Sequence, residues 1–138
     1  MIGLDTNVLA RYYVEDKSDP RAQRQRAAAR RLVESGQLLM VCKTAILELE
    51  WVMRGYYGFS ASEVLSVLRH LLALRHVTIE DRNTVTHALS YFEAGIDFAD
   101  ALHHASYRAC RSVASFDDKK FSRRAKKLGL APTVMVPA

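Results

Sequence analysis

Apolar residues follow two alternating patterns along this chain: short continuous runs, and longer stretches with helical spacing. The continuous runs predict strands, because a strand that is buried on both faces needs apolar residues at every position. They lie at residues 1–4, 38–42, 77–79, 112–116 and 133–136, the last as an edge strand. Apolar residues three and four positions apart predict helices at residues 8–14, 21–34, 44–56, 60–74, 82–94, 98–109 and 117–128.

Residues that favour helix ends stand at several of these boundaries. Thr44 and Asp97 are predicted to cap the helices that follow them. Ser60, with Glu63 three residues later, forms a capping-box pattern. Gly129 is predicted to close the last helix, because glycine adopts the left-handed conformation that often ends a helix.

The order of the predicted elements is β-α-α-β-α-α-β-α-α-β-α-β, which indicates an α/β sandwich around a mostly parallel sheet of four to five strands. A chain of 138 residues fits a single domain. In such sheets, ligands bind beyond the carboxyl ends of the strands. Asp5 follows the first strand and Asp117 the fourth, so we expect the two to face a common crevice.

The composition is that of a globular chain with an excess of positive charge. Apolar residues make up 49% of the chain, and the formal net charge is +5. The basic residues gather in two clusters: Arg21, Arg24, Arg26, Arg30 and Arg31, and then Lys119, Lys120, Arg123, Arg124, Lys126 and Lys127. Such clusters suit contacts with phosphates, but they also fit two solvated helix faces, and the sequence favours neither reading.

Nothing in the sequence indicates a membrane or a secreted protein. No segment approaches the roughly 18 consecutive apolar residues of a membrane span, and the first residues do not form a charged and then apolar leader. Cys42 and Cys110 lie among apolar neighbours, which favours two small buried residues in a reducing compartment over a disulfide. We therefore expect a cytoplasmic protein.

Acidic residues stand where strands end and helices begin. Asp5, Asp117 and Asp118 follow predicted strands, and each could simply cap a helix. Glu48 and Glu50 are harder to explain, because they lie about 200° apart around their helix. One of them must point toward the apolar side, where a carboxylate requires a partner.

Four segments carry these acidic residues in chain order. Residues 1–9 place Asp-Thr-Asn after an apolar strand, and residues 48–54 are Glu-Leu-Glu-Trp-Val-Met-Arg. Residues 97–102 are Asp-Phe-Ala-Asp-Ala-Leu, and residues 115–117 are Ser-Phe-Asp. Together they resemble the four motifs of PIN-domain ribonucleases, in which the last is usually Thr-Phe-Asp. The resemblance covers essentially the whole chain, and the length is most similar to that of VapC-type toxins from bacterial VapBC toxin–antitoxin systems.

The resemblance implies a PIN-like three-layer α/β/α sandwich, a single PIN domain over residues 1–138, and a metal-dependent ribonuclease. Its catalytic residues would be Asp5, Glu48, Asp100 and Asp117. Carboxylates that converge repel one another, by about 4 kcal/mol for a pair about 4 Å apart, and Mg²⁺ or Mn²⁺ would relieve this repulsion. Because Mg²⁺ keeps several waters, we expect Asp5 and Asp100 to bind it directly, and Glu48 and Asp117 partly through water.

Other residues are expected to support this chemistry. The supporting residues are Thr6, Asn7, Ser115 and Asp118, and the residues that position the RNA backbone are Lys119 and Lys120. The doubled Asp117 and Asp118 leave the fourth acid open: proximity to the strand end favours Asp117, and a count back from Phe121 favours Asp118. The family further implies cleavage to 3′-hydroxyl and 5′-phosphate ends.

Three other functional hypotheses compete with this one. Asp100, His103 and His104 have a spacing that could hold zinc, although a local packing role for the histidines is favoured. A catalytically inert PIN-fold module that binds RNA or assembles with partners is a second alternative. A phosphatase with an aspartyl nucleophile is disfavoured, because Asn7 stands where its second aspartate is typical.

The resemblance also implies partners. Toxins of this type form homodimers and bind a VapB-type antitoxin along a groove between helices. Trp51, Tyr56 and Tyr57, with the apolar stripe of the predicted helix at residues 60–74, are candidates for these interfaces or else for the core.

Overall fold

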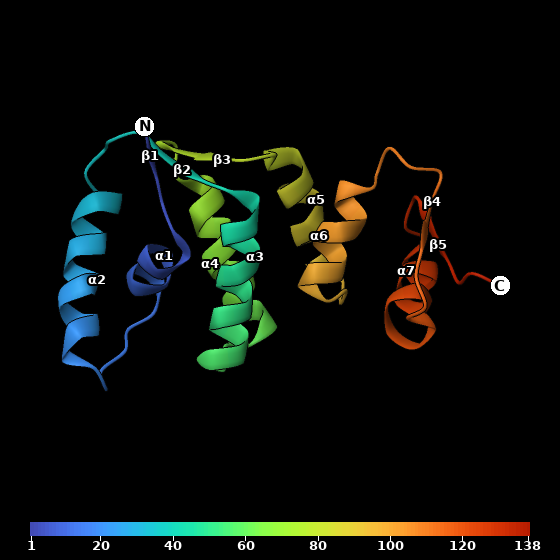
Figure 1. Cartoon of the computed structure of the whole chain (residues 1–138), viewed down its shortest axis with the longest axis horizontal. Coiled ribbons are helices and arrows are strands. Elements are labelled where there is room, and N and C mark those ends of the chain that lie inside the picture. The colour runs from blue at the N-terminus through green and yellow to red at the C-terminus, as the bar shows by residue number, and fades with distance from the viewer. The chain divides into compact units, whose positions relative to one another are not determined.

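A computed structural model of the chain describes residues 1–138 as two compact units, Met1–Asp81 and Arg82–Ala138. Each unit is described by itself. Figure 1 follows the chain from the N-terminal unit to the C-terminal one by colour. All five predicted strands are present and every strand pairing is parallel, so the predicted α/β class is confirmed.

The first unit holds a three-stranded sheet and four α-helices, two of which, α1 and α2, lie side by side (Figure 1). The elements of this unit are β1 (Ile2–Gly3), α1 (Thr6–Tyr13), α2 (Pro20–Val33), β2 (Leu39–Val41), α3 (Lys43–Trp51), the π-helical turn η1 (Val52–Tyr56), α4 (Ala61–Ala73) and β3 (Val77–Ile79).

The sheet of the first unit has the strand order β1-β2-β3. Ile2 pairs with Leu39, and Leu39 with Val77. Leu39 and Val41 are fully buried, as the continuous apolar run of β2 predicts. Because β1 and β2 are parallel, their carboxyl ends lie at the same edge, and α1 and α3 begin there.

The helix ends of the first unit follow the sequence signals with one exception. Ser60 accepts from the N–H of Glu63, whose carboxylate accepts from the N–H of Ser60, so the capping box is confirmed. The prediction that Thr44 caps α3 is wrong. The backbone enters the helix directly after β2, which makes Cys42 the cap residue, and the hydroxyl of Thr44 lies 3.3 Å from the Cys42 sulfur.

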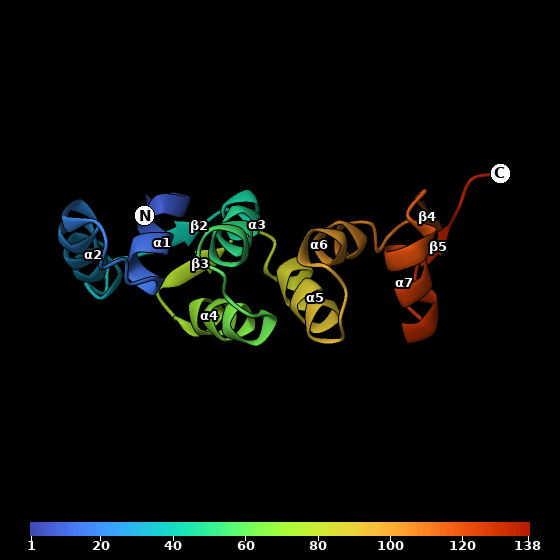
Figure 2. The same cartoon turned by 90° about the horizontal axis from the view of Figure 1, so that it is seen from below.

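The second unit holds a two-stranded sheet and three α-helices. The elements of this unit are α5 (Arg82–Glu93), α6 (Phe98–Ser106), β4 (Ser112–Ala114), the π-helical turn η2 (Asp118–Ser122), α7 (Arg123–Leu128) and β5 (Thr133–Met135). Helices α5 and α6 lie side by side (Figure 2), and Phe92 and Phe98 meet edge to face between them with ring centroids 5.5 Å apart.

Strands β4 and β5 pair in parallel, with Val113 opposite Val134. Gly129 closes α7 in the left-handed conformation, with φ of 64°, as predicted. Helix α6 ends at Ser106, three residues before the predicted position, because Tyr107 and Arg108 turn back onto the last carbonyl groups of the helix. None of the helices combines the length and the apolar character that a membrane span requires.

The cysteines differ from the prediction. Cys42 and Cys110 were expected to be buried, and both are exposed thiols. Each stands at an element boundary, Cys42 between β2 and α3 and Cys110 in the turn before β4, where the backbone turns at the surface.

Candidate active site

Asp5 stands where β1 passes into α1 and serves as the N-cap of that helix. Its backbone is extended, with φ of −80° and ψ of 160°, and its Oδ1 accepts from the N–H of Thr6 at 2.9 Å. The other carboxylate oxygen receives no hydrogen bond from the protein, and the side chain is exposed. Capping and cation binding are therefore compatible at Asp5, because the cap uses only one of its two oxygens.

Glu48 lines the same pocket as Asp5. The pocket has a volume of about 460 Å³, and Asp5 and Glu48 reach it from α1 and α3, the helices that start at the shared edge of the sheet. Thr6 is buried and holds Asp5 through its backbone N–H, whereas Asn7 is exposed and lines the pocket. The structure thus brings together Asp5, Glu48 and their predicted neighbours in the first unit.

Glu50 takes the opposite side of α3. It is 1% exposed, and its Oε2 accepts from Nε of Arg54 at 2.7 Å. The sequence argument that one of the two glutamates must face the apolar side is confirmed, and Glu50 is the one. Glu48 is exposed and lines the pocket, while Glu50 is buried and pairs with the partly exposed Arg54.

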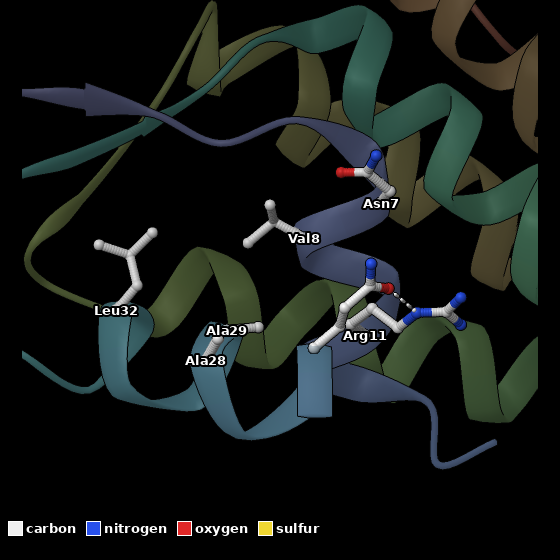
Figure 3. Close-up of a pocket in the computed structure, with 7 residues that line it drawn as sticks. Asn7, Val8, Arg11, Ala28, Ala29 and Leu32 are labelled. Carbon is white, nitrogen blue, oxygen red and sulfur yellow. Dashed lines mark hydrogen bonds between the residues drawn. The ribbon is translucent and has the colours of Figure 1, made fainter. Parts of the chain in front are cut away.

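Arg11 places a cation in this acidic pocket, and the sequence reasoning missed it. Its Nε donates to Oε1 of Gln25 on α2 at 2.9 Å, the bond drawn in Figure 3, and its Nη1 donates to the hydroxyl of Tyr57 at 3.3 Å. Asn7 and Arg11 are four residues apart, so both lie on one face of α1, toward α2 (Figure 3). That spacing was the signal available in the sequence.

Asp16 also lines the pocket. Hydrogen bonds from the hydroxyl and backbone N–H of Ser18 hold the pKa of Asp16 below its usual value, with smaller contributions from Arg11 and Tyr57. Asp16 is thus an anion that the loop after α1 stabilises locally. Its hydrogen bonds show a structural role, and nothing in the four sequence motifs pointed to it.

Asp100 lies in the second unit, in the first turn of α6. With Asp97, Lys120 and Arg124 it lines a pocket of about 230 Å³. Burial raises the pKa of Asp100, and the negative charges of Asp97 and Asp117 raise it further, while His103 opposes the change. A half-buried carboxylate with two acidic neighbours gains from a nearby cation.

Asp117 is held as an N-cap beyond the end of β4. Its Oδ1 accepts from the N–H of Lys120 at 3.0 Å, and its own N–H donates to the hydroxyl of Ser115 at 3.1 Å. The negative charge of Asp117 contributes to the raised pKa of Asp100, which favours Asp117 over Asp118 as the fourth acid. Ser115 therefore positions the acid that is preferred as the fourth member of the set.

Only some of the basic residues near Asp117 line the pocket of Asp100. Lys120 lines the pocket of Asp100, whereas Lys119 is exposed and does not line it. Arg124 also lines the pocket and donates to the carbonyl oxygen of Gly95 at 2.8 Å. Sequence reasoning named the two lysines and assigned Arg124 only to a general basic cluster.

The alternative zinc site of Asp100, His103 and His104 is not supported, because His104 packs in the core. His104 is fully buried, its Nε2 lies 2.7 Å from the carbonyl oxygen of Pro132, and its ring meets Tyr91 and Phe121 edge to face. His103 is exposed on the other side of the helix. The local packing role favoured for His104 is confirmed, and the proposed zinc triad with Asp100 is not supported.

The acidic residues fit a hard divalent cation that keeps most of its waters. Within each unit, no group of three or more histidine, cysteine or acidic side chains encloses a cation position. Asp5 and Glu48 nevertheless present carboxylate oxygens to a solvent-accessible pocket, and Asp100 and Asp117 repel each other. Mg²⁺ commonly binds through one or two carboxylates and several waters, so such pairs suit it.

A sequence model of the PIN domain matches residues 2–127, which is most of the chain. The chain belongs to the PIN domain family. A search of curated proteins gave no match. The matched region of this PIN domain includes Asp5, Glu48, Asp100 and Asp117, and therefore residues of both units.

PIN domains are usually nucleases and generally use divalent metal ions, so the family assignment supports hydrolysis of nucleic acids. The confirmed α/β fold with parallel sheets agrees with the PIN architecture. In this PIN domain the four acidic side chains lie after β1, on α3, on α6 and after β4, and Asp100 is the one that is partly buried.

Proposed function

We propose that this PIN domain is a Mg²⁺-dependent endoribonuclease, able to use Mn²⁺ as well, that hydrolyses RNA phosphodiester bonds. The observation that carries the proposal is the pocket of the first unit, in which Asp5 and Glu48 come from different helices and both keep carboxylate oxygens open to solvent. Neither side chain is needed by the core. Asp100 and Asp117 of the second unit are assigned to the same reaction.

The chemistry follows from these residue types. A bound divalent cation would lower the pKa of a water molecule and stabilise the negative charge that develops on the phosphate. Asp5 and Asp100 are proposed to bind it directly, with Glu48 and Asp117 acting partly through water. Lys120 lines the pocket of Asp100, where its ammonium group suits an RNA phosphate. Lys119 is exposed to solvent next to it and is proposed to contact the same RNA backbone. The products are 3′-hydroxyl and 5′-phosphate ends.

The deciding test is cleavage of RNA by the purified protein with Mg²⁺ or Mn²⁺. We expect EDTA to stop cleavage, and Asp5→Asn to stop it without loss of fold, because the amide keeps the cap geometry but is a poor cation ligand. Glu93→Gln is the matched control, since it removes one exposed carboxylate that lines neither acidic pocket. Cleavage that persists in both EDTA and Asp5→Asn would show that the metal mechanism is wrong.

The alternative is an inert PIN-fold module that binds RNA or assembles with partners. The four acidic residues with open oxygens favour catalysis over this alternative, because an inert module has no need of them. A folded wild-type protein that binds RNA but cleaves none in either metal would favour the module.

We further propose that the protein is the toxin of a VapBC-type pair, acts in the cytoplasm as a homodimer and is inhibited by a VapB-type antitoxin. Trp51 is 61% exposed on α3 and remains a candidate interface residue. The apolar stripe of α4 is no longer a candidate interface, because Val64, Leu68 and Leu71 are buried in the core. Expression without a partner is expected to stop growth, and expression of Asp5→Asn is not; normal growth with active, folded wild type would contradict the toxin role.

A further inference from the structure

The pocket of Asp5 and Glu48 carries an aromatic ring that the core does not use. Tyr56 lines this pocket and is 76% exposed, so burial contributes little to its position. It lies at the end of the π-helical turn η1, which continues α3 beyond Trp51. π-Helical turns are uncommon and are frequent at functional sites.

The orientation of Tyr56 is set by its neighbour. The rings of Tyr56 and Tyr57 meet edge to face, with centroids 4.8 Å apart and planes at 80°. The hydroxyl of Tyr57 is 3.4 Å from Oδ2 of Asp16 and accepts from Arg11, which holds the Tyr57 ring in place. The Tyr56 ring is therefore held by its contact with Tyr57 while most of its surface stays in solvent.

Arg11 stands in the same pocket with unused hydrogen-bond donors. Gln25 and Tyr57 each accept one of its five N–H groups, and they fix the plane of the guanidinium group. The remaining N–H groups have no acceptor in the protein. A fixed guanidinium group with free donors is suited to a phosphate, which it can contact with two parallel hydrogen bonds.

We propose that Tyr56 and Arg11 position the RNA in this pocket, with an unpaired base stacked on Tyr56 and a neighbouring phosphate bound by Arg11. The inference rests on the proposed ribonuclease function and adds two residues that position the substrate. An exposed aromatic ring stacks on any unpaired base, whereas the bases of a duplex offer it no free face. The carboxylates in the same pocket place that nucleotide beside the candidate cation site.

The test is binding of a 12-nucleotide single-stranded RNA and of the same RNA annealed to its complement, measured by fluorescence anisotropy with Mg²⁺ present. All variants are made in an Asp100→Asn background, and gels confirm that the RNA stays intact. Tyr56→Ala is expected to weaken binding of the single strand about 5- to 150-fold, the range found when an aromatic stacking partner is removed. It should leave duplex binding unchanged, so the preference for the single strand falls. Tyr56→Phe, which keeps the ring, should retain both.

Arg11 gives a separate readout. Arg11→Ala is expected to lower the slope of log affinity against log salt concentration by about 0.7, as the loss of one phosphate contact on a single strand does, and Arg11→Lys should restore the slope. Tyr57→Phe removes the hydroxyl that orients Arg11 and should weaken binding without changing the slope. Arg75→Ala and Tyr107→Ala are the controls, because both are exposed residues of the same types that do not line this pocket.

Single-strand affinity and strand preference that are unchanged in Tyr56→Ala would overturn the inference, and so would a salt slope that is unchanged in folded Arg11→Ala. These results are independent of cleavage. A protein that binds single strands through Tyr56 but never cleaves them would contradict the proposed function alone, and a nuclease indifferent to Tyr56 would contradict this inference alone.

Discussion

The two acidic regions of this PIN domain use the same residue types in different surroundings. In the first unit, Asp5 and Glu48 are exposed, and Arg11 supplies a positive charge to their pocket. In the second, Asp100 is half-buried, and burial together with Asp97 and Asp117 raises its pKa.

The two regions illustrate two ways in which a carboxylate can be made favourable for cation binding. At Asp5 the factor is geometric: the backbone N–H of Thr6 fixes one carboxylate oxygen and leaves the other open to solvent. At Asp100 the factor is electrostatic: its surroundings destabilise the ionised form, and a nearby cation would offset that destabilisation. Each region would therefore favour a cation for a different physical reason.

The largest expected effect is on cleavage. Asp100→Asn should lower the RNA cleavage rate more than about 100-fold, because even residues that only support metal ligands can cost up to about 100-fold. The measurement is initial cleavage rate at saturating Mg²⁺. Glu93→Gln is the control and should stay close to wild type, because Glu93 is exposed and lines neither acidic pocket. If Asp118→Asn lost activity and Asp117→Asn kept it, the assignment of the fourth acid to Asp117 would be wrong.

The next effect contrasts the two glutamates of α3. Arg54→Met leaves the carboxylate of Glu50 buried without its cation. We expect a loss of about 2 kcal/mol in the free energy of unfolding, less than for a fully buried pair, because the Arg54 side chain is 47% exposed. Urea denaturation measures it, with Arg75→Met as the control on an exposed arginine. Glu48→Gln should show the opposite profile, with lost cleavage and unchanged stability. A Glu48→Gln protein that unfolds more easily but cleaves normally would reverse the roles of the two residues.

A smaller effect is expected at Ser115. Ser115→Ala removes the hydroxyl that accepts from the N–H of Asp117 and should slow cleavage about 10-fold, the lower end of the range for residues that orient metal ligands. Ser115→Thr keeps the hydroxyl and should restore the rate. Equal rates in the alanine and threonine variants would show that Asp117 does not depend on this contact.

The smallest effect is a pH-dependent change in stability. Because the pKa of Asp100 is raised above its ordinary value of 3.8 on folding, the associated stability is present below that value and is lost as pH rises through the raised pKa. Without metal, Asp100→Asn should therefore melt at a slightly higher temperature than wild type at neutral pH, and the difference should vanish in acid. Asp118→Asn should show no such difference. Mg²⁺ should raise the melting temperature of wild type more than that of Asp100→Asn.

Local signals in the sequence predicted most elements and their ends. The capping box of Ser60 and Glu63 and the left-handed Gly129 depend on a few consecutive residues, so they are readable without the fold. The angular argument about Glu48 and Glu50 also needs only helix geometry. Thr44 shows the limit of such signals, because β2 passes into α3 without the extra residues that a threonine cap there would require.

The tertiary structure decided what the sequence could not. Whether Glu48 or Glu50 faces the pocket depends on what packs against α3, and the neighbours of Asp100 depend on the turn after β4. Arg11 meets Gln25 and Tyr57 across 14 and 46 positions of the chain, and no local pattern encodes such contacts. The sequence by itself determined the acidic motifs, the α/β class and the family resemblance, because these follow from residue type and spacing. The structure assigned the exposed Tyr56 and the guanidinium of Arg11 to the acidic pocket, because only folding brings distant side chains together.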